Sequence, residues 1–284
     1  YKEQISAGYL SVSSNFTATD FLKLGLRVEN TNLNTINNYT AAKVKQNYTN
    51  WFPSIFYSRK LTPTQSISAS YSRSIQRPSF QLLSNEIQKI NDFNYIIGNP
   101  DLTPEFKNAF EITYQQKKNV VSFYYNSTID NINALYFTEN DIAYLKNQNI
   151  GTQVEYGVEY GTSKKITNWW HMQYSATLFH SKFLDENQQS NFEKTSFYTN
   201  FSTNFTLNNT THFDVIGRYI SPTTAPYNEN EAFHSFIFVF KKSFLQKKLQ
   251  LRVTIDDVFN TIRYNSVNTF ENYTTRKTDK PMTQ

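Results

Sequence analysis

Carboxylates and histidines are the side chains of this sequence that could carry acid–base or metal chemistry. Asp256 and Asp257 are adjacent, but neighbours on an extended strand point to opposite faces, so the two cannot share a proton as a catalytic pair. The histidines lie far apart, without the short spacings of metal ligands; they are His171, His180, His212 and His234. The absence of cysteine excludes disulfides and cysteine-bound metals. We therefore expect no enzymatic activity, no metal and no cofactor.

Most other charged residues alternate with apolar residues. Between Phe21 and Asn30, leucine and valine occupy the even positions, while Lys23, Arg27 and Glu29 occupy odd positions. This period of two is typical of a strand with one apolar and one polar face. The pattern predicts about twelve strands, at residues 5–15, 21–30, 51–61, 66–74, 106–116, 120–131, 152–162, 167–180, 193–207, 211–221, 231–243 and 248–258. Ten charged residues share the polar faces, namely Lys23, Arg27, Glu29, Glu111, Glu155, Glu159, Asp214, Arg218, Arg252 and Asp256.

The lengths of the connections indicate what kind of sheet these strands form. Short links alternate with long ones; the long ones are residues 31–50, 75–105, 132–151, 183–192, 222–230 and 259 onward. Short periplasmic turns and longer outer loops are typical of outer-membrane barrels, and the strands match the ~9–11 residues needed to cross a bilayer. The sequence therefore predicts an all-β, antiparallel, up-and-down transmembrane β-barrel in the outer membrane, with its polar faces lining the lumen.

The composition agrees with a barrel. Aromatic residues make up 17% of the chain and charged residues 18%, as an outward apolar band with aromatic girdles requires. The mean hydropathy is nonetheless only −0.60, which a polar lumen explains. No apolar run approaches the ~18 residues of a membrane-spanning helix. The net charge of +5 is spread along the chain without a dense basic run, so we expect no nucleic-acid partner.

Several motifs add a family resemblance that covers nearly the whole chain. They are Gly25-Leu26-Arg27-Val28-Glu29; Tyr71-Ser72-Arg73 followed by Gln76-Arg77-Pro78-Ser79-Phe80; Gly98-Asn99-Pro100-Asp101-Leu102-Thr103-Pro104-Glu105; and Asp256-Asp257-Val258-Phe259-Asn260-Thr261. Together they resemble the C-terminal barrel of TonB-dependent outer-membrane receptors, in particular the outer-membrane β-barrel protein family. We interpret a subset as structural, namely Tyr71, Arg73, Arg77, Pro78, Gly98, Asn99, Pro100, Pro104, Glu105, Asp257, Phe259 and Asn260. Gly98 would give backbone freedom for a tight turn, and Pro104 suits the start of a strand.

The resemblance implies a barrel of about 22 strands, occluded by an N-terminal plug that contacts TonB. Residues 1–284 would then be a partial barrel domain, the later part of that barrel, with the plug, the early strands and the final strand outside it. The implied function is active uptake of a scarce nutrient, such as a siderophore or a glycan. The implied partners are outer-membrane lipid, the protein's own plug domain, the TonB complex and the small-molecule or glycan substrate.

Two sets of residues could contact the substrate in that setting. The ten charged lumen residues could face either the plug or the substrate. In the long loops, ring stacking and hydrogen bonding to a sugar or siderophore could come from Tyr39, Tyr48, Trp51 and Tyr95. Three alternatives stay open: a TonB-independent porin or adhesin, a secreted β-rich carbohydrate-binding module, and an outer-membrane hydrolase with Ser and His on adjacent strands.

Overall fold

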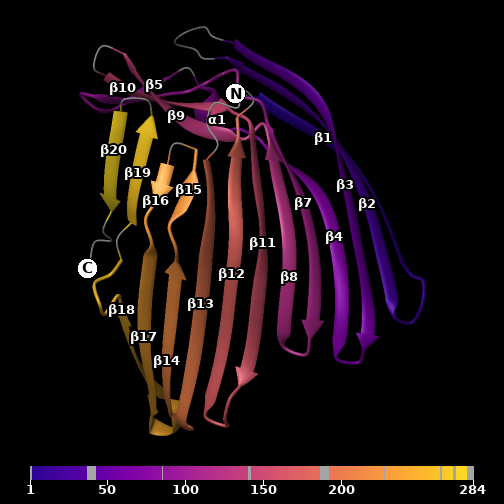
Figure 1. Ribbon diagram of the computed structural model, residues 1–284, viewed down its shortest axis with the longest axis vertical. Helices are drawn as coiled ribbons and strands as arrows, with labels where there is room; N and C mark the ends of the chain where they lie inside the picture. Colours follow the sequence, from indigo (N-terminus) through magenta and orange to yellow (C-terminus); the bar gives the residue numbers. More distant parts are fainter. Residues whose placement is uncertain are drawn as a thin grey trace.

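The computed structural model describes residues 2–36, 43–84, 86–139, 142–185, 192–226, 228–262, 264–270 and 273–279. Its main element is one curved sheet of twelve strands, in which each strand pairs antiparallel with the next one of the sheet (Figure 1). The strands are β1 (Lys2–Asn15), β2 (Asp20–Ile36), β3 (Lys43–Thr62), β4 (Gln65–Gln76), β7 (Glu105–Gln116), β8 (Asn119–Ile129), β11 (Thr152–Lys165), β12 (Trp170–Leu184), β13 (Phe192–Asn208), β14 (Thr211–Ile220), β17 (Phe233–Phe244) and β18 (Leu249–Asp256). The twelve predicted strands and their up-and-down order are confirmed.

The register of the sheet keeps apolar and polar residues on separate faces. One cross-strand row of the outward face runs through Leu24, Ile55, Tyr71, Phe110, Tyr125 and Tyr156. The neighbouring row of the inner face runs through Gly25, Ser54, Ser72, Ala109, Asn126 and Glu155. Because side chains alternate along each strand, aligning the apolar positions of one strand with those of the next aligns the polar positions too.

The two ends of the sheet differ. Short turns join the strands at the lower end of Figure 1, and the 3-10 helix η1 (Leu245–Lys247) lies in the turn between β17 and β18. The long connections gather at the upper end. Among the described residues, no helix is long and apolar enough to cross a membrane.

The long connections contain more regular structure than the sequence predicts. β2 and β3 continue as a paired hairpin up to Ile36 and Lys43, through most of the expected loop at 31–50. Two further sheets form from β5 (Ile87–Asn91), β6 (Asn94–Ile97), β9 (Ile132–Glu139) and β10 (Ile142–Asn149), and from β15 (Thr223–Ala225), β16 (Asn228–Asn230), β19 (Tyr264–Phe270) and β20 (Tyr273–Asp279). The long connections are thus largely paired strands: local hairpins form within single connections, and β6 with β10 and β16 with β19 join them across longer sequence distances.

A small apolar core lies among these connections. Leu33 from β2, Leu83 from α1 (Phe80–Leu83) and Leu102 are buried against one another, and Leu102 is fully buried. Gln46 of β3 donates to the Leu102 carbonyl at 2.8 Å. The loop of residues 77–104 is thus held against the β2–β3 hairpin at the long-loop end of the sheet.

Candidate functional site

The inner face of the sheet carries all ten charged residues predicted for the lumen. Their partners in the register are other inner-face residues; for example, Lys23 lies opposite Phe56, Glu111 opposite Ser70, and Arg252 opposite Lys241. The structure spreads them along the sheet instead of gathering them at one point. Lys23 and Arg27 are exposed near one edge, whereas Arg252 and Asp256 are exposed on β18 at the other edge.

Three of the ten meet in a cleft in the middle of the sheet. Glu111, Glu155 and Glu159 line it together with Tyr124, and Lys107 contributes a single positive charge. The Thr113 hydroxyl donates to Glu111 Oε1 at 2.6 Å. Carboxylates with so few cations nearby create a negative surface, which favours a cationic or hydroxyl-rich partner in the lumen.

Two other charged residues make defined contacts on the inner face. Lys241 Nζ lies 2.7 Å from Asp214 Oδ2, and Asn204 donates to the same carboxylate. Arg218 donates from Nε to Asn200 Oδ1 at 3.3 Å and lines a separate cleft with Gln173. These contacts tie neighbouring strands together close to the short-turn end and midway along the sheet.

Arg77 joins two of the sequence motifs. Its Nη2 donates to Glu29 Oε2 at 2.8 Å and to Thr31 Oγ1 at 2.9 Å, and Glu29 also pairs with Arg27. Glu29 and Thr31 are buried. Because β3 lies between β2 and β4, this contact pulls the segment after β4 inward, across the concave face of the sheet.

The Gly98–Glu105 motif connects several loops. Asn99 donates from Nδ2 to the Asn147 carbonyl at 2.9 Å, and Glu105 Oε2 accepts from Asn131 and from the Ile132 amide. A Cβ on Gly98 would stand 1.5 Å from the Ser84 carbonyl oxygen, and its φ lies outside the left-handed region. Gly98 therefore serves close backbone packing, which corrects the expectation of turn flexibility. Pro78 and Pro104 are buried, Pro100 is half-buried, and Pro104 directly precedes β7.

The two remaining motifs lie largely on the outward face. The Tyr71 and Phe110 rings are tilted against each other with centroids 4.5 Å apart, and the Tyr71 hydroxyl donates to Asn108 Oδ1. Arg73 lies over the Phe106 ring at 4.9 Å. At the end of β18, Asp257 accepts hydrogen bonds from the amides of Thr261 and Ile262 at 2.7 and 3.0 Å. Asn260 closes that turn through the Asp257 carbonyl, and Phe259 packs edge-on against Phe236.

The loop aromatics predicted to contact a substrate separate into different environments. Tyr48 lies in β3 on the inner face, opposite Thr31, and Tyr95 lies in β6. Trp51 also lies in β3, but on the exposed outward face, so its expected place in an outer loop is corrected. Tyr39 lies outside the described residues.

The sheet formed by β5, β6, β9 and β10 contains a row of rings that the sequence alone does not predict. Tyr144 lies 5.6 Å from Tyr95 and 5.2 Å from Phe137, centroid to centroid. β10 pairs parallel with β6 and antiparallel with β9, which brings the three rings into register. The alternation around Tyr144 could have indicated a strand, but its partners lie in segments up to 49 residues away in the sequence.

Two of the histidines, His171 and His180, lie on the same strand, β12, whereas His212 lies on β14 and His234 on β17. Three of the four rings contact hydroxyl groups, and His212 contacts Thr206 at 3.3 Å. His171 contacts Ser163 at 3.1 Å and His180 contacts Thr195 at 3.0 Å. In the described part of the chain, no three His, Asp or Glu side chains come close enough to hold a metal ion.

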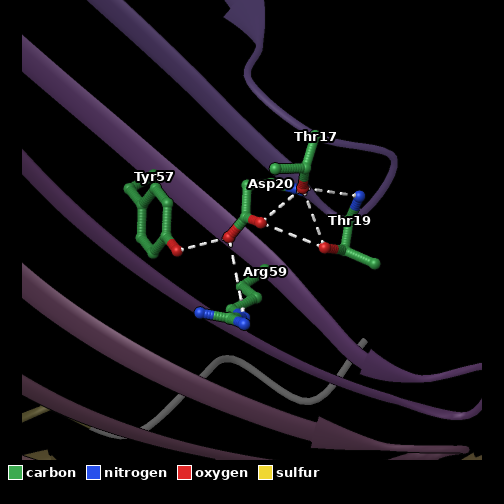
Figure 2. Close-up of polar contacts among 5 residues, drawn as sticks. All are labelled: Thr17, Thr19, Asp20, Tyr57 and Arg59. Carbon is green, nitrogen blue, oxygen red and sulfur yellow. Dashed lines mark hydrogen bonds and ion pairs between the residues drawn. The ribbon is translucent and has the colours of Figure 1, made fainter.

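A polar cluster lies at the turn between β1 and β2 and on the facing end of β3 (Figure 2). Asp20 accepts hydrogen bonds from Thr17 at 2.5 Å, Thr19 at 3.0 Å and Tyr57 at 2.6 Å, and Arg59 lies 3.6 Å away. These hydroxyl donors, Thr17 first and then Tyr57, lower the pKa of Asp20 to about 2. The carboxylate stays ionised throughout the physiological range and closes this turn.

Comparison with known proteins agrees with the geometry. The fold is similar to the copper transporter OprC (TM-score 0.70, 14% identity over 92% of this chain and 42% of that one). It is also similar to the ferric-catecholate import receptor Fiu from K12 E. coli (0.63, 14%, 93% and 41%) and the FrpB iron transporter from Neisseria meningitidis (0.63, 16%, 92% and 42%). The chain thus spans less than half of each of these structures.

No curated protein sequence matches the chain. A family model described as the outer membrane protein beta-barrel family matches residues 1–284 in full. This chain therefore belongs to the outer membrane protein beta-barrel family and is an integral protein of the outer membrane.

Proposed function

We propose that this chain is the later part of the barrel of a TonB-dependent receptor that takes up a scarce nutrient across the outer membrane. The observation that carries the proposal is the twelve-stranded sheet: the chain matches a copper transporter, a ferric-catecholate import receptor and an iron transporter over more than nine-tenths of its length. Because it spans 41–42% of those chains, the rest of the barrel and the plug would come from elsewhere in the full protein.

The polar inner face has two roles in this proposal. The cleft of Glu111, Glu155 and Glu159 would meet a basic surface of the plug, or a polar substrate passing beside it. The remaining charged lumen residues would hydrate the wall or pair with the plug. Energy would reach the plug from TonB, so the described residues need no cofactor or catalytic group of their own.

The loop sheets would select the substrate. Tyr95 and its neighbours Tyr144 and Phe137 present rings at the outer end, where a siderophore, a glycan or a metal complex would first be bound. Tyr48 would contribute from the inner face of the β2–β3 hairpin.

The test uses the full-length protein, because the isolated sheet has two open edges. The purified protein is reconstituted in a planar bilayer and, separately, passed over immobilised TonB periplasmic domain. We expect an electrically silent bilayer, since a plug closes the lumen, and retention on TonB. Steady conductance without TonB retention would overturn the proposal in favour of a passive porin.

A further inference from the structure

Pairs of adjacent basic residues occur six times in the sequence. They are Arg59-Lys60, Lys117-Lys118, Lys164-Lys165, Lys241-Lys242, Lys247-Lys248 and Arg276-Lys277. In the sequence they form no basic run: 27 to 75 residues separate successive pairs, except Lys241-Lys242 and Lys247-Lys248, which four residues separate. The fold, however, places most of these pairs at the same end of the sheet.

The structure brings the first five pairs to one edge of the molecule. Each lies in a short turn or in the last residues of a strand beside it, at the lower end of Figure 1. The sixth pair lies in β20, at the long-loop end. The five pairs at the short turns, Arg59 to Lys248, are called the basic rim below. The segments that form this end, at 14–20, 59–66, 115–120, 163–171, 205–214 and 241–252, contain only two acidic residues, Asp20 and Asp214.

Both of these carboxylates already form ion pairs with basic residues of the rim. Asp20 lies 3.6 Å from Arg59 within its hydroxyl cluster (Figure 2), and Asp214 lies 2.7 Å from Lys241. The other lysines of the rim, apart from Lys242, are exposed, and within the described residues no carboxylate pairs with them. The rim therefore carries a net positive charge at one end of a chain whose remaining residues are net negative.

The strand geometry divides the pairs at strand ends between the two faces. Lys164 lies opposite Met172 on the outward face, and Lys165 lies opposite His171 on the inner face. In the same way, Arg59 and Lys242 face outward, whereas Lys60 and Lys241 face inward. The outward members stand where the apolar band ends.

An aromatic belt lies on β12, β13 and β14, at the same short-turn end of the sheet as Lys164 and Lys242. The Trp170 ring stacks on Phe205 at 5.9 Å, Phe205 stacks on Phe213 at 6.2 Å, and Trp169 lies 5.8 Å from Phe205. Trp and Tyr rings concentrate at the level of lipid headgroups. Lysine can keep its stem along apolar surface while its ammonium group reaches the headgroups.

We propose that the outward cations of the basic rim bind the phosphate groups of anionic phospholipids in the leaflet on the short-turn side. The charge is complementary, and two of the three outward cations, Arg59 and Lys164, are exposed, whereas Lys242 is half-buried. The aromatic belt lies at the same end of the sheet as Lys164 and Lys242, at headgroup depth. Each such cation enriches an anionic lipid beside it by about fivefold over a zwitterionic one. The binding concerns the lipid shell of the barrel and does not depend on transport.

The test compares two adjacent lysines that differ only in the face they occupy. Full-length protein and its Lys164→Glu and Lys165→Glu variants are inserted into phosphatidylcholine vesicles containing a fixed fraction of either brominated phosphatidylglycerol or brominated phosphatidylcholine. Bromine quenches nearby tryptophan, and Trp169 and Trp170 lie beside Lys164 along the chain. We expect stronger quenching by the brominated phosphatidylglycerol for the unchanged protein and for Lys165→Glu, and a severalfold smaller preference for Lys164→Glu.

Salt gives a second measurement on the same samples. Raising it from 0.05 to about 1 M shortens the screening length from above 10 Å to about 3 Å, so the preference should fall with it. Equal quenching by both lipids in the unchanged protein would overturn the proposal. A loss in Lys165→Glu but not in Lys164→Glu would overturn it as well, because the inward member of the pair would then carry the lipid preference.

Discussion

Arg77 and Glu29 form an ion pair of 2.8 Å between two segments that are not neighbours in the sheet. Glu29 is 2% exposed and Arg77 is 19% exposed. Thr31 accepts a second hydrogen bond from the same Arg77 nitrogen. The pair therefore fixes the start of the loop after β4 to the inner face of β2, and it joins two motifs that are separated by 48 residues in the sequence.

Glu29→Gln should destabilise the full-length barrel by about 1–3 kcal/mol, because the half-buried Arg77 guanidinium loses its charged acceptor. The measurement is the loss of the compact, heat-modifiable gel form as temperature rises in detergent. Lys23→Gln is the matched control, since Lys23 is exposed on the same strand and face; it should change stability by less than about 0.5 kcal/mol. Equal effects would show that the buried pair adds nothing.

Gly98→Ala should disrupt the loop of residues 77–104. The new methyl group would overlap the backbone carbonyl of Ser84, which cannot move without displacing α1. Overpacking of this kind costs about 1–3 kcal/mol or more. Protease cleavage of this loop on intact cells reports the change. Gly161→Ala is the control, because a Cβ there meets nothing within 4 Å, and cleavage of the loop should be unchanged.

Asp20 should make stability depend on pH at the acid end. Its pKa is lowered from 3.8 to about 2 in the folded protein, so the folded form favours the ionised carboxylate. This contribution is present above about pH 4 and disappears as the pH falls through 2. The thermal midpoint of Asp20→Asn should lie below that of the unchanged protein at pH 7, and the difference should shrink between pH 4 and 2. Tyr57→Phe, which removes one of the hydroxyl donors to Asp20, should give a smaller loss of thermal midpoint at pH 7 than Asp20→Asn. If the difference between Asp20→Asn and the unchanged protein stayed constant from pH 7 to 2, the lowered pKa of Asp20 would be contradicted.

Asp257→Ala should lower the thermal midpoint and loosen the turn after β18, because the amides of Thr261 and Ile262 lose their acceptor. Hydrogen exchange of those two amides is the direct measurement. Asp256→Ala is the control, since Asp256 is exposed on the inner face and its side chain accepts from neither amide. Equal exchange in both variants would contradict a capping role for Asp257.

The sequence by itself determined the strands, their faces and their order. Alternation is a local property, so residues such as Leu24 and Arg27 reveal the outward and inner faces without knowledge of any partner strand. The alternation of short and long links likewise follows from the chain alone, and it was sufficient to predict a barrel and its two ends.

Only the tertiary structure decided what the loops and the charges do. The rings of Tyr95 and Tyr144 meet because β6 and β10 pair in parallel. Position 98 requires glycine because a Cβ there would overlap the Ser84 carbonyl oxygen. Both depend on contacts across many residues, which local periodicity does not encode. The same holds for the basic rim. The pairs from Arg59-Lys60 to Lys247-Lys248 are scattered along the chain, but in an antiparallel sheet every second connection lies at the same end, so the fold gathers these pairs along one edge.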